Sequence, residues 1–295
     1  MKFITEIHAG CRASGRPAIS FEFFPPKTDE GDRALLEKTV PALLAVKPDY
    51  CSVTYGAGGS TRGKTLDIVD RLQREHHLPA MTHLTCVNST RAQLADVLAE
   101  ARARGIVNVL ALRGDPPNGS SEFTKTDGGF EYSRELVEFI REQGGFSIGT
   151  AGFPEGHIAC KAGKHVDWGY LREKIEAGAD FVITQLFFSN DDFFEFRDHL
   201  TKKLGVNVPI VPGILPILSH GQTKKFVTLC GAQLPGPFIR RIEELGDDDA
   251  AVTEFGIEYA ANQCKELLEA GAPGLHFYTL NKAHSVARIM ERLRP

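Results

Sequence analysis

Two carboxylates stand where apolar runs of the sequence give way to proline-containing loops, and both could do chemistry there. Glu22 lies in ISFEFFPPK (19–27), among phenylalanines, and Asp115 lies in RGDPP (113–117). Apolar surroundings disfavour the ionised form of a carboxyl group and raise its pKa, which suits a general acid at neutral pH. We therefore expect a raised pKa and a proton-donating role for Glu22. For Asp115, an ion pair with Arg113 at a strand end is the alternative to a chemical role.

Further polar residues fall near the carboxyl ends of predicted strands. Ser20 and Glu22, like Ser52 and Thr54, alternate with apolar neighbours, so each pair shares one face of its strand. If that face is the interior of a barrel, these side chains converge on one mouth, where barrel enzymes place their chemistry. The full set at strand ends comprises Glu22, Thr54, His83, Arg113, Asp115, Gln185, Asn281 and Lys282.

The elements that must position these residues repeat one local pattern. A charged amphipathic stretch, a Gly or Pro stop and a β-rich apolar run recur along the chain, as in EARARGIVNVLALRG (100–114). Strands that alternate with helices predict parallel βαβ units, and eight of them fit a (β/α)8 barrel in one domain, residues 1–295. A doubly wound open sheet is the alternative, but the first strand and turn carry no G-x-G-x-x-G fingerprint. The predicted strands are 19–24, 49–55, 79–86, 108–114, 147–153, 181–188, 209–216 and 274–281.

Composition excludes several classes of protein. A hydrophobic content of 42% and a charged content of 24% are typical of a globular chain with a sizeable core. A net charge of -4 argues against nucleic acid as a partner. The six cysteines are scattered without a Cys-x-x-Cys pair, so they predict reduced thiols and no metal site. No apolar run has the length of a membrane span, and we expect a cytoplasmic protein without a signal peptide.

Other interpretations of the same residues remain open at this point. Two strand-end carboxylates could serve a glycosidase, although Trp168 is the only tryptophan available for sugar stacking. A Schiff-base aldolase would need a lysine at a strand end, and Lys282 lies just beyond one. His83 is more simply a hydrogen-bonded histidine than a metal ligand. The turn GAGGSTR (56–62) could bind an anion at a helix N-terminus. The phenylalanines at 187–196 favour a core or a subunit contact.

Seven segments together resemble one family. ISFEFFPPK, SVTYGAGGSTR, THLTC, LALRGDPP, ITQLFF, PGILP and HFYTLNK, in this order, resemble the methylenetetrahydrofolate reductases of the bacterial type, over roughly residues 15–290. The resemblance implies a (β/α)8 barrel that binds FAD, accepts hydride from NADH or NADPH in ping-pong fashion, and reduces 5,10-methylenetetrahydrofolate to 5-methyltetrahydrofolate. It places the enzyme in one-carbon metabolism and methionine synthesis. We also expect a homo-oligomer.

The resemblance also implies roles for particular residues. Glu22 would give a proton to N10 of the folate, and the charge of Asp115 would stabilise the cationic iminium that results. Thr54 would serve nicotinamide or folate as well as the flavin site. The other cofactor-binding residues would be Tyr55, Ala57, His83, Arg113, Gly114, Asp115, Tyr132, Ser133, Phe153, His157, Asp167 and Lys174; the substrate-binding residues would be Gln185, Gln222, Phe226 and Lys282.

The chain departs from the family pattern at three places. Phe153 stands where relatives commonly have Tyr, Ile158-Ala159 stand where they have Pro-Glu, and Glu173 stands where a basic residue can contact the FAD phosphates. The long forms of the family add a regulatory domain that binds S-adenosylmethionine, and we expect that control to be absent here. A flavin-poor folate barrel acting in methyl transfer, or with a separate electron-donating subunit, is the second hypothesis, and a glycosidase-like hydrolase is the third.

Overall fold

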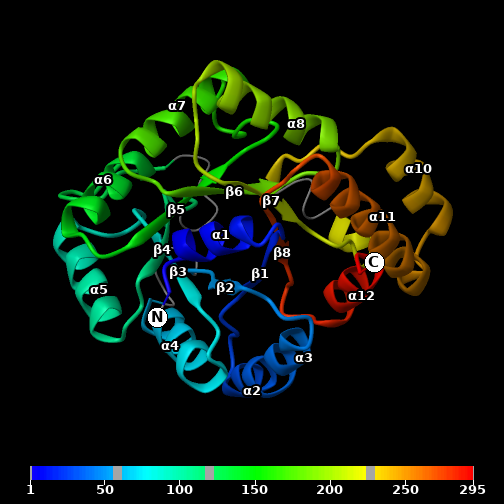
Figure 1. Cartoon of the computed structure of the whole chain (residues 1–295), viewed down its shortest axis with the longest axis horizontal. Helices are drawn as coiled ribbons and strands as arrows, with labels where there is room; N and C mark the ends of the chain where they lie inside the picture. The colour runs from blue at the N-terminus through cyan, green and yellow to red at the C-terminus, as the bar shows by residue number, and fades with distance from the viewer. Residues whose placement is uncertain (1, 56–61, 117–122, 224–229, 295) are drawn as a thin grey trace.

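Eight parallel strands form a closed barrel in which each strand pairs with its neighbours in chain order (Figure 1). The computed structural model of the chain describes residues 2–55, 62–116, 123–223 and 230–294. The barrel closes where β1 pairs with β8, with Glu22 opposite Tyr278. The strands are β1 Ala18–Phe23, β2 Tyr50–Val53, β3 Ala80–Thr85, β4 Asn108–Leu112, β5 Ser147–Gly152, β6 Phe181–Leu186, β7 Ile210–Ile214 and β8 Gly274–Tyr278.

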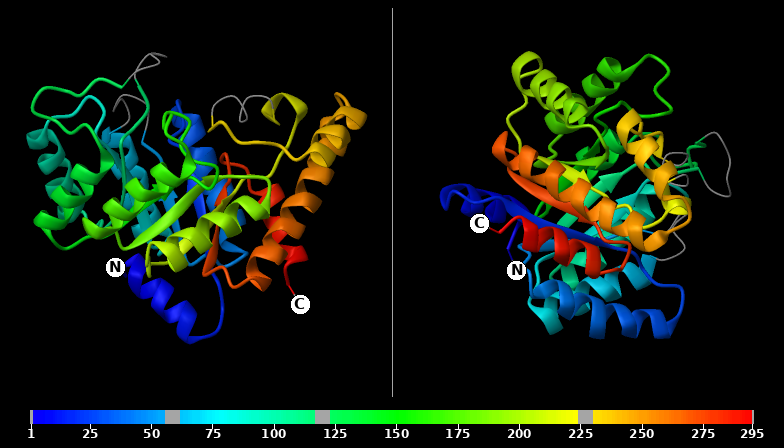
Figure 2. Two further views of the ribbon diagram at one scale, coloured as in Figure 1. Left: turned by 90° about the horizontal axis from the view of Figure 1, so that it is seen from above. Right: turned by 90° about the vertical axis from the view of Figure 1, so that its right-hand side faces the viewer.

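Helices surround the barrel, and one further helix lies across one of its ends (Figures 1 and 2). Two segments, η1 and η4, are single π-helical turns that continue the helix before them. The helical elements are α1 Ile4–Ala13, α2 Asp29–Ala34, η1 Leu35–Thr39, α3 Val40–Leu44, α4 Arg62–His76, α5 Arg91–Ala103, α6 Ser133–Gln143, α7 Lys164–Glu176, α8 Asn190–Asp198, η4 His199–Lys203, α10 Gly236–Leu245, α11 Asp249–Glu269 and α12 His284–Arg292.

The predicted (β/α)8 barrel is confirmed, and the open-sheet alternative is wrong. All eight predicted strands are present, but each ends one to three residues earlier than the apolar run that predicted it. β8 stops at Tyr278 because Leu280 and Asn281 adopt positive φ angles of 49° and 57°, which turn the chain out of the extended conformation. Likewise β4 stops before Gly114, whose φ is 86°. The shortened strands leave polar residues in the turns above the barrel.

The lower half of the barrel interior is mainly apolar. Its strand residues pack against Ile4, Ile7 and Cys11 of α1. The amino ends of the strands face α1, because the Asn108 side chain at the start of β4 accepts a 2.9 Å hydrogen bond from the backbone N–H of Ile4. The polar groups around Glu22 occupy the opposite half, toward the carboxyl ends of the strands. The apolar strand residues are Ala18, Tyr50, Met81, Leu110, Phe181, Ile183 and Val211.

A second and larger core fills the layer between the strands and the outer helices. Phe21, Phe23 and Phe277 belong to it, as do Phe187, Phe193 and Phe196, so the prediction of a core role for these last three phenylalanines is confirmed. The cysteines are all free. Within the described ranges, every helix is too short or too polar to cross a membrane.

Candidate active site

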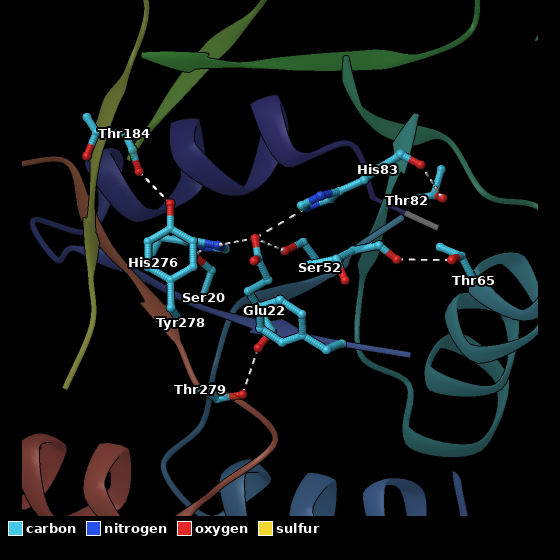
Figure 3. Close-up of polar contacts among 12 residues, drawn as sticks. Ser20, Glu22, Ser52, Thr65, Thr82, His83, Thr184, His276, Tyr278 and Thr279 are labelled. Atoms are coloured by element: carbon cyan, nitrogen blue, oxygen red, sulfur yellow. Dashed lines mark hydrogen bonds and ion pairs between the residues drawn. The ribbon is translucent and has the colours of Figure 1, made fainter. Parts of the chain in front are cut away.

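Glu22 lies at the centre of a polar cluster inside the barrel (Figure 3). Its side chain is almost fully buried, with 6% of the residue exposed. One carboxylate oxygen, Oε2, lies 3.4 Å from each of three groups contributed by β8, β3 and β2. These are Nε2 of His276, Nε2 of His83 and the hydroxyl of Ser52, which donates to the carboxylate. Four strands therefore converge on one oxygen, and the period-two alternation predicted this for β1, β2 and β3.

The expected rise in the pKa of Glu22 is wrong. Burial does raise the pKa of this carboxyl, but the nearby imidazoles of His83 and His276 outweigh burial and lower it to about 2. The reason lies in the alternation of β1. Phe21 and Phe23, the neighbours in sequence, point outward into the core between strands and helices, so the carboxyl group is surrounded by polar groups of other strands.

The backbone around Glu22 is held firmly to the end of β8. The hydroxyl of Thr279 donates a 2.7 Å hydrogen bond to the carbonyl of Glu22, and the side-chain amide of Asn281 bonds both the N–H and the carbonyl of Phe24. On the other side, the N–H of Thr54 bonds the carbonyl of Phe23. These contacts fix the position of the carboxylate without using the carboxylate itself. The group is thus preorganised for chemistry at the mouth.

Two residues of β8 belong to the cluster although the sequence did not single them out. His276 is fully buried and its Nδ1 lies 2.8 Å from the hydroxyl of Ser20. Tyr278 packs edge-on against His276, with ring centroids 5.5 Å apart, and donates a hydrogen bond to the carbonyl of Thr184. The signal was present, because His276 and Tyr278 are spaced by two in HFYTL and must share a face of the strand.

His83 was predicted to be a hydrogen-bonded histidine, and its Nε2 lies 3.4 Å from Oε2 of Glu22 in an ion-pair contact. The atom is buried and lies near the carboxylate of Glu22, but among the described residues it has no partner in hydrogen-bonding geometry. An unpaired buried nitrogen is costly unless a ligand or water satisfies it. His83 therefore has hydrogen-bonding capacity left for a molecule bound in the barrel mouth.

A second cluster follows β4 and β5 and contains charged residues. Lys174 of α7 is partly exposed, and its ammonium group donates a 2.7 Å hydrogen bond to the carbonyl of Ala151. Burial of the ammonium lowers the pKa of Lys174 to about 8, which Asp167 opposes. Burial also raises the pKa of Asp167, with Lys174 opposing, and burial together with the charge of Arg113 lowers the pKa of His157. The cluster therefore has a lysine without a full counter-charge.

The turn after β4 needs the glycine that the sequence provides. Gly114 has a φ of 86°, and a Cβ there would lie 2.7 Å from a methyl group of Val87. The turn exposes the side chain of Asp115, and Arg113 stacks on the ring of Phe123 at 5.1 Å. The charge of Asp115 opposes the lowering of the pKa of His157, so this carboxylate is close enough to influence the second cluster. A rigid turn thus presents both charged residues toward the same region.

The outer edge of this cluster contains the remaining residues expected at the cofactor. Tyr132 is 56% exposed and precedes α6, which begins at Ser133. Phe153 packs edge-on against His157, with ring centroids 4.6 Å apart. Glu173 lies 3.8 Å from Arg134 of α6, so its carboxylate is directed toward a neighbouring helix. The negative charge at this departure from the family pattern is therefore partly neutralised.

The residues expected at the folate fall into two groups. Gln222 and Lys282 line one cavity of about 440 Å³, together with Ser219 and Leu280. Both ends of the Gln222 amide are occupied, because its oxygen accepts from the N–H of Leu218 and its nitrogen donates to the carbonyl of Pro216. Gln222 thus shapes the loop after β7.

Gln185 lies on β6, two residues beyond the inward-facing Ile183, and is half-buried. Tyr55 packs partly against the outer core near the end of β2. Ala57, the glycine-rich turn that contains it, and Phe226 lie outside the described residues. Among the predicted site residues that the structure describes, most lie on or after the carboxyl ends of the strands.

The arrangement does not support the two alternative chemistries, a glycosidase and a Schiff-base aldolase. Trp168 is fully buried and its indole N–H donates to the carbonyl of Phe153, so it cannot stack on a sugar. Lys282, the candidate lysine of a Schiff-base aldolase, is exposed in the turn after β8 and does not lie on a strand. In the parts of the chain that are described, no three His, Cys, Asp or Glu side chains are grouped so as to hold a metal ion.

Comparison with known proteins gives a consistent result. The family model described as methylenetetrahydrofolate reductase matches residues 7–294. A protein of Arabidopsis thaliana named methylenetetrahydrofolate reductase (NADH) 1 is 39% identical over 303 residues, which cover 99% of this chain and 51% of the plant protein. A 5,10-methylenetetrahydrofolate reductase of Pectobacterium carotovorum is 36% identical over 269 residues, covering 91% of this chain and 87% of that protein. The chain thus spans about half the length of its plant relatives.

A solved structure supports the fold independently. An uncharacterised protein from Clostridium thermocellum, described as binding two copies of 5-methyl-5,6,7,8-tetrahydrofolic acid, superposes with a TM-score of 0.64 at 13% identity. The match covers 94% of this chain and 93% of that protein. At this identity the likeness concerns the barrel architecture alone.

Proposed function

Because this chain belongs to the methylenetetrahydrofolate reductase family, we propose that it reduces 5,10-methylenetetrahydrofolate to 5-methyltetrahydrofolate. The proposal takes FAD as the bound cofactor and NADH or NADPH as the electron donor, in a ping-pong sequence. We favour NADH, because plant relatives carry NADH in their names. The residues of the barrel mouth supply the support for each part of the proposal.

The cluster around Glu22 is the observation that carries the proposal. Reduction of the folate requires the bond between its methylene carbon and N10 to break, and N10 must take up a proton as it does so. Glu22 is buried, fixed through its backbone and contacted by two imidazoles, which are groups able to hold and pass a proton. We propose that Glu22, whose low pKa leaves it ionised in the free protein, takes a proton from one of these imidazoles in the bound complex and gives it to N10. Loss of N10 leaves a cationic iminium on N5, which the negative charge of Asp115 would stabilise.

The second cluster fits a dinucleotide cofactor. Arg113 and Lys174 would hold the diphosphate of FAD, since Lys174 has a buried ammonium without a full counter-charge. His83 would direct its Nε2, which has no partner in hydrogen-bonding geometry among the described residues, to the ring system. Tyr132, Ser133, His157 and Asp167 would line the remaining length of the site. When bound there, FAD would supply the two-electron chemistry that passes hydride from nicotinamide to folate. The protein residues bind it, exclude water and move the proton.

We expect the purified protein to be yellow and to release FAD, not FMN, on denaturation. Replacement of Arg113 by Ala should weaken FAD binding by about 10- to 100-fold, because a charge-assisted contact to phosphate is lost. Fluorescence quenching of added FAD measures the dissociation constant, and the exposed Arg172→Ala serves as the control. A protein that is colourless and does not take up FAD would favour the flavin-poor folate barrel instead.

The lowered pKa of Lys174 predicts that FAD binding depends on pH. The pKa of its ammonium is about 8, below the usual value, so above that pH the lysine of the free protein loses its proton. A bound diphosphate favours the charged form, and binding must then take up a proton. The affinity for FAD should therefore fall as pH rises through 8, by at most about tenfold per pH unit. Titrations at about pH 7, 8 and 9 measure the slope.

The comparison with Lys174→Met isolates this contribution. The variant should bind FAD more weakly at pH 7 and should lose most of the slope above pH 8. Lys161→Met removes an exposed lysine in the loop before α7 and should keep the parent slope. An unchanged slope in Lys174→Met would place the diphosphate elsewhere.

A further inference from the structure

Strand β6 contains one extra residue near its carboxyl end, where it pairs with β7. Between two consecutive paired positions the register advances from Ile183 to Leu186 along β6, but only from one residue to the next but one along β7. Thr184 and Gln185 therefore lie together opposite Pro212. β-Bulges of this kind redirect side chains and are frequent next to active sites. The position of Gln185, a residue expected at the folate, is thus set by a bulge and not by regular alternation.

The backbone at the bulge has exchanged its usual hydrogen-bond partners. The N–H of Val182 donates to the carbonyl of Pro209 at 2.8 Å. A parallel ladder continued from this bond would join the N–H of Gly213 to the carbonyl of Thr184. Instead, the N–H of Gly213 donates to the hydroxyl of Thr184 at 2.9 Å. The carbonyl of Thr184 accepts from the hydroxyl of Tyr278 of β8 at 2.6 Å (Figure 3). Two side-chain hydroxyls thus replace one bond of the ladder.

The hydroxyl of Tyr278 stabilises this exchange. Thr184 is fully buried, so without Tyr278 its carbonyl would lose its donor in a place closed to water, which is costly. Gly213 allows the contact, because a Cβ there would lie 2.7 Å from the ring of Tyr278. A carbonyl that has lost Tyr278 can be satisfied again by the N–H of Gly213, in the regular ladder. That return removes the bulge.

Return to the regular ladder would displace Gln185. In the structure Leu186 pairs with Gly213. Without the extra residue Gln185 would take this pairing position, and Leu186 would turn to the other face of the sheet. The bulge also fixes the amide of Gln185, because its oxygen accepts a 3.0 Å hydrogen bond from the N–H of Leu186. The oxygen is occupied, so the hydrogen bonds of the described residues leave the NH2 group of this amide for a ligand.

We propose that Tyr278 is a positioning residue for Gln185: its hydroxyl holds the bulge from which the NH2 group of Gln185 donates a hydrogen bond to the folate ring. The inference rests on the proposed function and adds to it the chemistry of one contact. Because the NH2 group can only donate, the ligand atom that it meets is an acceptor, namely the carbonyl oxygen or an unprotonated nitrogen of the pterin.

Tyr278→Phe tests the inference, because it deletes the hydroxyl and keeps the ring that packs on His276. Binding of 5-methyltetrahydrofolate should weaken by about 3- to 10-fold, the loss typical of an uncharged hydrogen bond. Gln185→Ala should weaken binding by a similar factor. The double variant should bind no more weakly than Gln185→Ala alone, since the position of the amide has no effect once the amide is absent. Anaerobic titration calorimetry, with any bound flavin reduced by dithionite, measures the dissociation constants without turnover.

Tyr259→Phe is the matched control. The hydroxyl of Tyr259 on α11 also donates to a backbone carbonyl, that of Phe188, which lies shortly after β6 and outside the bulge. This variant should bind 5-methyltetrahydrofolate as the parent does. Thr184→Val removes the acceptor of the N–H of Gly213 and should weaken binding as Tyr278→Phe does. It tests the bulge even if Tyr278→Phe does not fold.

Parent affinity in both Tyr278→Phe and Thr184→Val would overturn the inference. Effects of Tyr278→Phe and Gln185→Ala that add in the double variant would also overturn it, because they would be independent. Crystal structures of the parent and Tyr278→Phe measure the position of Gln185 without any ligand, and we expect Gln185 to pair with Gly213 in the variant. An unchanged bulge would overturn the inference whatever the protein binds. A parent that does not bind 5-methyltetrahydrofolate would instead contradict the proposed function.

Discussion

Glu22→Gln should leave the reduction of bound FAD by NADH near the parent rate and slow reoxidation by methylenetetrahydrofolate by about 10²- to 10⁴-fold. Glutamine keeps the shape of the side chain but cannot give a proton. Hydride transfer from nicotinamide needs no acid, whereas release of N10 does. The two half-reactions, followed separately by stopped-flow absorbance of the flavin, should therefore separate.

The structure indicates that Glu22→Gln should change the chemistry of the side chain and not its position. Glutamine can still occupy the position beside Ser52, His83 and His276, and the backbone contacts from Thr279 and Asn281 do not involve the carboxylate. Glu254→Gln, which removes an exposed carboxylate paired with Arg288, is the control and should affect neither half-reaction. If Glu22→Gln reoxidises at the parent rate, or loses its flavin and both half-reactions together, Glu22 is a structural residue and the proton has another source.

Asp115→Asn should slow the folate half-reaction by about 10²- to 10³-fold, because the cationic iminium loses a fixed negative charge. The same change should raise the reduction potential of bound FAD and speed its reduction by NADH. The structure shows that the charge of Asp115 reaches its surroundings, since it acts to raise the pKa of both His157 and Cys230. Potentiometric titration and stopped-flow kinetics measure the two effects.

Opposite changes in the two half-reactions are the signature of an electrostatic role. Asp127→Asn neutralises another exposed carboxylate between β4 and α6 and should leave the potential and both rates unchanged. If Asp115→Asn slows both half-reactions by the same factor, its effect is on the turn that contains Gly114 and the electrostatic explanation fails.

The sequence was sufficient to predict the barrel and the meeting of its polar residues. Each strand has its own local signal of branched and aromatic residues bounded by Gly or Pro, and the alternation of Ser20 with Glu22 sets which side chains point inward. The geometry of a parallel barrel then brings Ser52 and His83 to Glu22 with no further information. These predictions depend only on short-range patterns and on closure of the sheet.

The pKa of Glu22 could not be predicted in the same way. The phenylalanines beside it in sequence point to the other face of β1, and the group that hydrogen-bonds it, His276, is 254 residues away along the chain. Likewise, the contact of Glu173 with Arg134 depends on how α7 packs on α6. Electrostatic properties are set by neighbours in space, and a local pattern does not show them.

Helix α1, which lies across one end of the barrel (Figure 1), is synthesised before the strands on which it packs. Its N–H at Ile4 bonds a side chain 104 residues later in the chain, at the start of β4. At the usual pace of translation, about 5 to 20 residues per second, α1 leaves the ribosome some 5 to 20 s before Asn108 does. During that interval the apolar face formed by Ile4, Ile7 and Cys11 has no barrel to close. This helix is thus exposed to chaperones and to other nascent chains until half of the barrel has been made.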